Sequence, residues 1–94
     1  MYKAFSLPKF ESQLKKLHAK EQFVVGAEIK RILADPTIGE MKRGPLKGIH
    51  VHKFKVHHQL YLLAYEMDAK SRSVYLYALA SHENFYKALE RYVR

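Results

Sequence analysis

The 94-residue sequence contains no cysteine and no tryptophan. Without cysteine, a disulfide framework and a thiolate metal site are both excluded. The apolar runs at residues 60–65 and 74–80 are far too short to cross a bilayer, and the first ten residues lack the apolar stretch of a signal peptide. We therefore expect a cytoplasmic protein that has no membrane partner.

Acidic residues are scarce, since nine Asp and Glu against 17 Lys and Arg give a formal net charge of +8. Such a surplus on a small protein favours nucleic acid, an acidic protein or an anionic surface as the partner. The hydrophobic fraction of 48% is too high for a disordered tail, and the length suits one core. The sequence therefore predicts a single globular domain over residues 1–94.

One stretch, residues 41–58 (MKRGPLKGIHVHKFKVHH), has no acidic residue at all. Its second half predicts a strand over residues 49–56, because apolar and polar residues are interleaved there. A positive, imidazole-rich strand suits a polyphosphate backbone, although such charges also protect a sheet edge from aggregation. The cationic and imidazole residues of this stretch are Lys42, Arg43, Lys47, His50, His52, Lys53, Lys55, His57 and His58.

The remaining pattern predicts a strand over residues 2–5, a helix pair within residues 7–34, and a surface loop over residues 37–48. Two further strands are expected over residues 60–67 and 74–80, followed by a helix over residues 82–93. The short links between the last three strands predict an antiparallel meander. The fold class is therefore α+β, in the order strand, helix, helix, three-stranded antiparallel meander, helix, with the helix pair on one face.

The strand over residues 49–56 contains a change of phase. Its apolar residues change parity midway, which predicts a bulge near His52 that returns all of them to the core face. These apolar residues are Ile49, Val51, Phe54 and Val56. With such a bulge, His50, Lys55 and His57 lie on the open face, which is the face away from the helix pair.

Three short motifs follow one another along the chain. They are GPLKG at residues 44–48, YLLAY at residues 61–65 and SHENFY at residues 81–86. Together they resemble the RelE/ParE superfamily of toxins from type II toxin–antitoxin pairs, whose members share a PLxG turn, a YxLxY central strand, and a histidine or arginine followed by an aromatic residue. This resemblance covers nearly the whole chain and implies a cognate antitoxin that is acidic or binds DNA.

The resemblance also implies the activity. Ribonuclease members of the family enter the ribosome and cut messenger RNA, whereas other members inhibit DNA gyrase. Several ribonuclease members carry an arginine where Leu62 stands here, but the YafQ-like branch relies on histidines and an aromatic residue instead. With His50, His82 and Tyr86, this sequence resembles that branch. We expect an endoribonuclease without metal or cofactor; the alternatives are a gyrase inhibitor and an inactive homologue that only binds its antitoxin.

RNA can be cut without metal if one group accepts the 2′-hydroxyl proton and another protonates the leaving oxygen. Histidine suits both roles because its ordinary pKa is about 6.5, and lysine or arginine stabilises the phosphoryl charge. We predict that His82 is the leading acid or base, with His50 as its counterpart and Lys55 beside the phosphate, while Tyr86 positions the nucleotide. The predicted RNA and phosphate contacts are Lys42, Arg43, Lys47, His52, Lys53 and His57.

Plainer interpretations of the same residues remain open. His50 and His52 form an H-x-H pair that could bind a metal, but the sequence shows no evident third ligand, so no metal site is predicted. The turn residues His57 and His58 also fit solvated side chains. His82 could simply start the last helix, and Tyr86 could pack beneath it.

Overall fold

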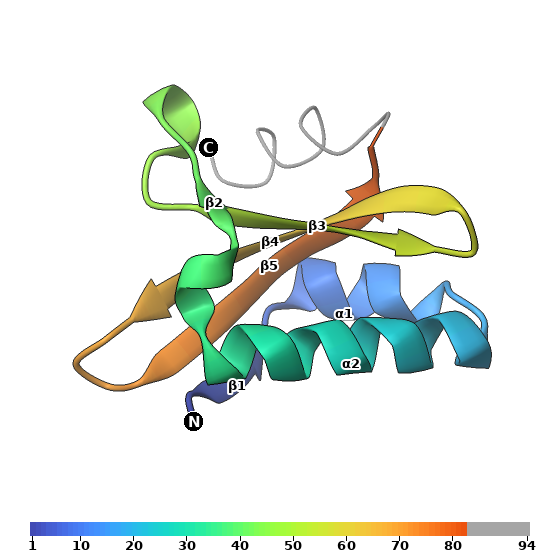
Figure 1. Cartoon of the computed structure of the whole chain (residues 1–94), viewed down its shortest axis with the longest axis horizontal. Coiled ribbons are helices and arrows are strands. Elements are labelled where there is room, and N and C mark those ends of the chain that lie inside the picture. The colour runs from blue at the N-terminus through green and yellow to red at the C-terminus, as the bar shows by residue number, and fades with distance from the viewer. Residues whose placement is uncertain (83–94) are drawn as a thin grey trace.

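The structure, a computed structural model, describes residues 1–82. Two helices cover one face of a five-stranded sheet whose strand order is β1-β5-β4-β3-β2 (Figure 1). The elements are β1 (Lys3–Ser6), α1 (Pro8–Lys15), α2 (Ala19–Ala34), β2 (Glu40–Met41), β3 (His50–Val56), β4 (Gln59–Asp68) and β5 (Ser73–Ser81), with short 3₁₀ turns η1 (Pro36–Ile38) and η2 (Gly44–Leu46).

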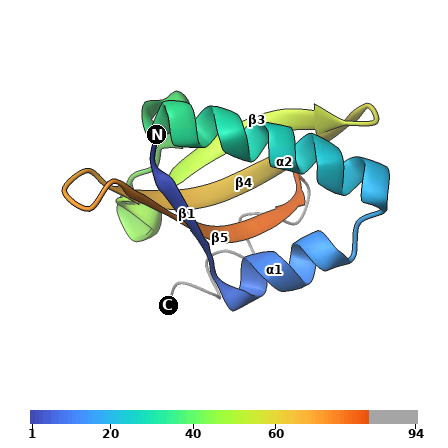
Figure 2. The same ribbon diagram turned by 90° about the horizontal axis from the view of Figure 1, so that it is seen from below.

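The helix pair lies on a single face, as the apolar spacing predicted (Figure 2). Proline in the first turn suits the start of α1, where its missing N–H group is not needed. At the start of α2, the backbone N–H of His18 donates to the carboxylate of Glu21 at 2.9 Å, as in a capping box. Val25 and Ile32 are fully buried and form the stripe with which α2 packs on the sheet.

β4 is the central strand, as its apolar character on both faces predicted. Leu63 and Tyr65 are buried towards the helices, whereas Leu62 and Ala64 are buried on the opposite face. β3, β4 and β5 form the expected antiparallel meander. The sheet as a whole is mixed, because the edge strand β1 pairs with β5 in parallel. Parallel neighbours require a long connection, and here the whole chain between the two strands provides it.

The bulge predicted near His52 is absent, and that prediction was wrong. All seven residues of β3 pair with β4 in an unbroken register. The register shift lies between β4 and β5 instead. Ala64 pairs with Ala78 and Tyr65 with Leu76, so the extra residue is Tyr77 of β5.

A second apolar cluster explains why β3 needs no bulge. Phe54 and Val56 face the helices and belong to the main core. Ile49 and Val51 are buried on the opposite face together with Leu46. Because each face of the sheet has its own cluster, the change of parity in the sequence reflects two cores and not an extra residue.

The segment predicted as a surface loop, residues 37–48, carries more structure than expected. It contains β2, which extends the sheet beside β3, and it is fastened to the core by Tyr65. The hydroxyl of Tyr65 accepts the N–H of Gly39 at 3.0 Å and donates to the carbonyl of Pro36 at 2.6 Å. Burial raises the pKa of Tyr65, so the hydroxyl keeps its proton for this bond.

The predicted last helix and Tyr86 lie outside the described residues. Within residues 1–82, no helix is long and apolar enough to span a membrane.

Candidate nucleic-acid interface

The open face of the sheet carries a row of residues that crosses three strands. Lys55 of β3 lies directly opposite Leu60 of β4. On the other side of β4, the backbone N–H of His82 donates to the carbonyl of Leu60 at 3.0 Å. Directly opposed residues of antiparallel strands share a face, so Lys55 and His82 flank Leu60 on one row. Two strand spacings separate their backbones by about 10 Å.

A second, parallel row lies beside the first. Lys53 is opposite Leu62, and Leu62 is opposite Ala80 of β5. Both lysines and His82 are exposed to solvent. The structure therefore brings Lys53, Lys55 and His82 to one face of the sheet, on the side away from the helices, as predicted.

The histidines of β3 lie on the other face. His50 and His52 are only 6% and 7% exposed, on the side that faces the helices. The expected convergence of His50 with Lys55 and His82 is therefore wrong, because a strand without a bulge sends alternate residues to opposite faces.

Both buried histidines contact side chains on the helix side of the sheet. The His50 ring stacks on Tyr65 with centroids 5.3 Å apart, and burial lowers its pKa. Its Nδ1 atom has no hydrogen-bond partner within the described chain. The Nε2 atom of His52 lies 2.7 Å from the carboxylate of Glu28, which joins β3 to α2. In residues 1–82, no group of three His, Asp or Glu side chains gathers as it would around a metal ion.

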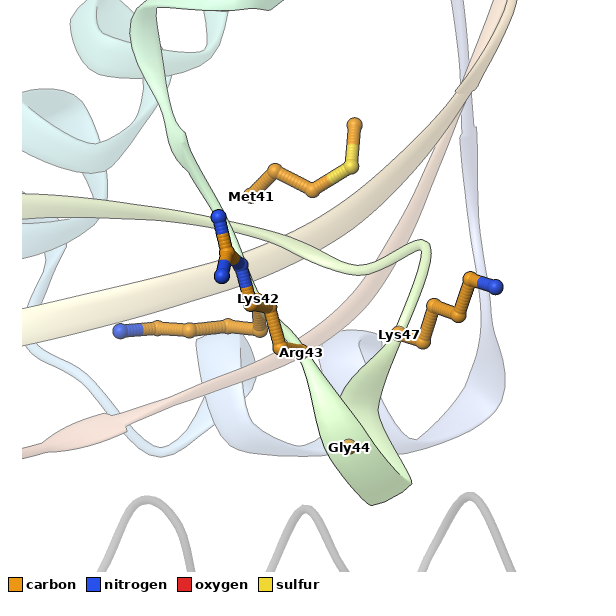
Figure 3. A pocket seen from close by; sticks show the side chains of 5 residues that line it. All are labelled: Met41, Lys42, Arg43, Gly44 and Lys47. Carbon is orange, nitrogen blue, oxygen red and sulfur yellow. The ribbon is translucent and has the colours of Figure 1, made fainter.

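The loop around η2 supplies further positive charge. Met41, Lys42, Arg43, Gly44 and Lys47 line a cavity of about 500 Å³ (Figure 3). The side chain of Lys47 points away from those of Lys42 and Arg43, so the loop presents cations on two sides (Figure 3). Because Leu46 of η2 packs in the apolar cluster of the open face, the loop lies on the same side as the two rows.

One carboxylate lies among these cations. Glu40 of β2 forms an ion pair with Lys42. The hydrogen bond from Lys42 lowers the pKa of Glu40, and attraction by Lys53 adds to the effect. These interactions connect the loop to the second row, so the positive surface extends from η2 to the row of Lys55.

At the far end of β3, His57 and His58 form the whole turn between β3 and β4. Both have a positive φ, 49° and 71°, and both are exposed. His58 and His82 line one cavity of about 320 Å³ together with Gln59, Leu60 and Ser81. Sequence reasoning counted His57 among the RNA contacts but left out His58. The sequence did contain a signal for His58. The link between β3 and β4 is only two residues long, and this brings the turn beside the end of β5.

Comparisons with known proteins concern the family and the fold of this chain. A sequence profile of ParE-like toxins of type II bacterial toxin–antitoxin systems matches residues 5–90. A search of curated protein sequences found no match.

Several solved structures share the fold at low sequence identity. A double arginine-to-alanine mutant of the E. coli RelE toxin, in the free state, superimposes with a TM-score of 0.74 at 14% identity, covering 98% of this chain and 93% of that one. A chain of the intact E. coli RelBE toxin–antitoxin complex gives 0.69 at 16% identity, with 85% and 95% covered. The RelBE2 complex from Mycobacterium tuberculosis gives 0.69 at 17% identity, with 86% and 98% covered.

The profile match extends over nearly the whole sequence, and the fold superimposes on those solved toxins. This chain belongs to the family of ParE-like toxins of type II bacterial toxin–antitoxin systems.

Proposed function

We propose that this toxin is an endoribonuclease that cuts messenger RNA at the ribosome, without a metal ion or cofactor. The observation that carries the proposal is the row formed by Lys55, Leu60 and His82. It places an exposed imidazole and an exposed ammonium about 10 Å apart at the backbone, on the positive face of the sheet. That spacing leaves room for one phosphodiester between the two side chains.

The reaction follows from the chemistry of these groups. A base removes the 2′-hydroxyl proton, and the 2′ oxygen attacks the adjacent phosphorus. The bond to the 5′ oxygen breaks, and an acid protonates that leaving oxygen. His82 carries one of these proton transfers, while Lys55 and Lys53 stabilise the charge on the phosphoryl oxygens. Tyr86, which lies outside the described residues, would position the nucleotide by stacking.

The other residues predicted to contact RNA differ in where they lie on the sheet. Arg43, Lys47 and His57 are exposed, so we assign them to flanking phosphates, and Lys42 contributes charge beside Glu40. His50 and His52 face the helices and take no part in this proposal.

The partner follows from the same surface. Two of the structural neighbours are toxin–antitoxin complexes, and a third is a RelE mutant bound to an antitoxin peptide. We infer that a cognate antitoxin binds this chain and covers the positive face with acidic groups, in the cytoplasm where translating ribosomes are found. Complex formation should then weaken as salt rises.

The test is cleavage of messenger RNA on translating ribosomes, read by primer extension. His82→Gln should keep the fold, because the residue is exposed, and should slow cleavage about a hundredfold to ten-thousandfold. Lys15→Ala, on α1 behind the sheet, is the matched control and should cut at the wild-type rate. A His82→Gln protein as active as wild type would refute the catalytic role of His82.

One observation favours a second function without RNA cleavage, either antitoxin binding alone or inhibition of DNA gyrase. Leu62, where several ribonuclease members carry an arginine, is fully buried in an apolar cluster beside Lys53. The central strand therefore contributes no cation to the open face at this position. Wild-type protein that cuts no RNA but blocks gyrase supercoiling would select gyrase inhibition, and absence of both activities would indicate a homologue that only binds its antitoxin.

A further inference from the structure

The turn between β3 and β4 has an unfavourable composition. Two-residue hairpin turns with two positive φ values are normally built from Asn-Gly or similar pairs, because a side chain with a Cβ is crowded there. Here both positions are histidine, with φ of 49° and 71°. Backbone strain of this kind destabilises the fold and is concentrated at functional sites. The imidazoles therefore occupy positions where the backbone would favour other residues.

The turn holds one of these imidazoles beside the proposed reaction site. His58 lines the same cavity of about 320 Å³ as His82. The N–H of His82 is bonded to the carbonyl of Leu60, only two residues after His58, so the end of β5 is fixed against the start of β4. Lys55, the neighbouring cation on β3, is opposite Leu60 in the same row. Two imidazoles thus line a single hollow at this end of the sheet, and the residue opposite Leu60, one of the other lining residues, is a lysine.

We propose that His58 is the second catalytic histidine and acts together with His82. His50 cannot take this role, because it is buried on the side that faces the helices. One imidazole accepts the proton of the 2′-hydroxyl as the bond between the 2′ oxygen and phosphorus forms. The other donates a proton to the 5′ oxygen as its bond to phosphorus breaks. The products are a 2′,3′-cyclic phosphate and a free 5′-hydroxyl. One histidine gains a proton in the reaction and the other loses one. This inference rests on the proposed function.

The strained turn allows a sharp test, because the substitution that removes the imidazole also relaxes the backbone. His58→Gly suits a positive φ, and His58→Asn tolerates one. Both variants should be as stable as wild type or more so in thermal unfolding, yet their cleavage should be about a hundredfold to ten-thousandfold slower. Their affinity for an oligonucleotide with a 2′-deoxy group at the cut site should change by only a few fold. His18→Gln, an exposed histidine at the start of α2, is the matched control and should behave as wild type.

The pH dependence of cleavage gives a second readout. Wild-type cleavage should rise and then fall with pH, since one histidine must be neutral and the other charged. Within the described residues, His58 and His82 are the only ionisable side chains that line the hollow, with Lys55 opposite Leu60 on the neighbouring strand, so one limb should disappear in His58→Gly.

The outcomes separate the two claims. Wild-type cleavage together with full activity in both His58 variants would overturn the role of His58 and leave the proposed ribonuclease intact. A wild-type protein that cuts no RNA would overturn the proposed function, and the role of His58 with it. Slow cleavage by stable His58 variants, with a normal His18→Gln protein, supports both.

Discussion

At the scale of single residues, His50 makes the stability of the fold depend on pH. Burial lowers the pKa of His50 below its ordinary value, and the nearby charge of Glu66 only partly opposes this. The unfolded chain therefore binds a proton at His50 more readily than the folded chain. The free energy of unfolding should be at its full value above about pH 6.5 and should fall as the pH decreases from there towards the folded pKa.

Replacing the imidazole should remove this slope. His50→Phe keeps a ring that can stack on Tyr65 and removes the unpaired Nδ1 atom. Urea unfolding at several pH values between 5 and 7 should show a flatter profile for this variant, while His18→Gln should keep the wild-type slope. Asp35 and Glu40, whose pKa values are lowered, act only at more acidic pH, so they do not obscure the window. An unchanged slope in His50→Phe would assign the effect to another group.

The residues of the site were only partly predictable from sequence. Lys53, Lys55 and His82 were placed on the correct face because charge and exposure go together. His50 was misplaced, because a change of apolar parity looks the same whether a strand bulges or packs on both sides. His58 was interpreted as a solvated turn residue, because sequence shows a turn but not the strand end beside it.

At the scale of elements, the link between α2 and β3 depends on a close approach. A Cβ atom added at Gly39 would lie 2.5 Å from the hydroxyl of Tyr65, a side chain with no exposed surface. Gly39→Ala should therefore break the bonds that Tyr65 makes to the link and destabilise the protein by about 1–3 kcal/mol.

A second glycine provides the control for this prediction. Gly26, inside α2, has nothing within 4 Å of an added Cβ. Gly26→Ala should stabilise the protein by about 0.5–1 kcal/mol, because alanine is the better helix former. Urea unfolding of both variants measures the two effects. Equal changes in stability would mean that the contact with Tyr65 does not hold the link.

The elements differ in how well sequence predicts them. The helix pair and the meander were predicted because each has a repeated apolar period over many residues. β2 was not, since two residues show no period and the strand exists only through its pairing with β3. The parallel pairing of β1 was likewise invisible, because nothing in a four-residue strand records the direction of its neighbour.

At the scale of the whole molecule, the net charge of +8 should make RNA binding depend strongly on salt. The binding constant for a single-stranded oligonucleotide without a cleavable 2′-hydroxyl should fall steeply between about 50 and 200 mM salt. The double variant Lys53→Ala/Lys55→Ala should lower the slope of log affinity against log salt by about 1.4, since two phosphate contacts are lost. Fluorescence anisotropy measures this slope.

The predicted change in slope depends on where the lysines lie and not only on the net charge. A second double variant tests this. Lys15→Ala/Lys16→Ala removes the same charge from the end of α1, on the helix side of the sheet. Its slope should stay close to that of wild type. Equal losses in the two double variants would indicate a diffuse attraction to the whole protein instead of a defined face.

The parallel pairing of β1 with β5 also determines when the protein can become complete during its synthesis. Lys3 lies opposite Ser73, so β1 has no partner until β5 has been translated, after the other described strands. The meander must assemble before the N-terminal strand can close the sheet, because closing so long a loop early is entropically costly. A nascent chain that stops before residue 73 therefore leaves β1 without a neighbour, and the toxin can form its finished sheet only after β5 has been synthesised.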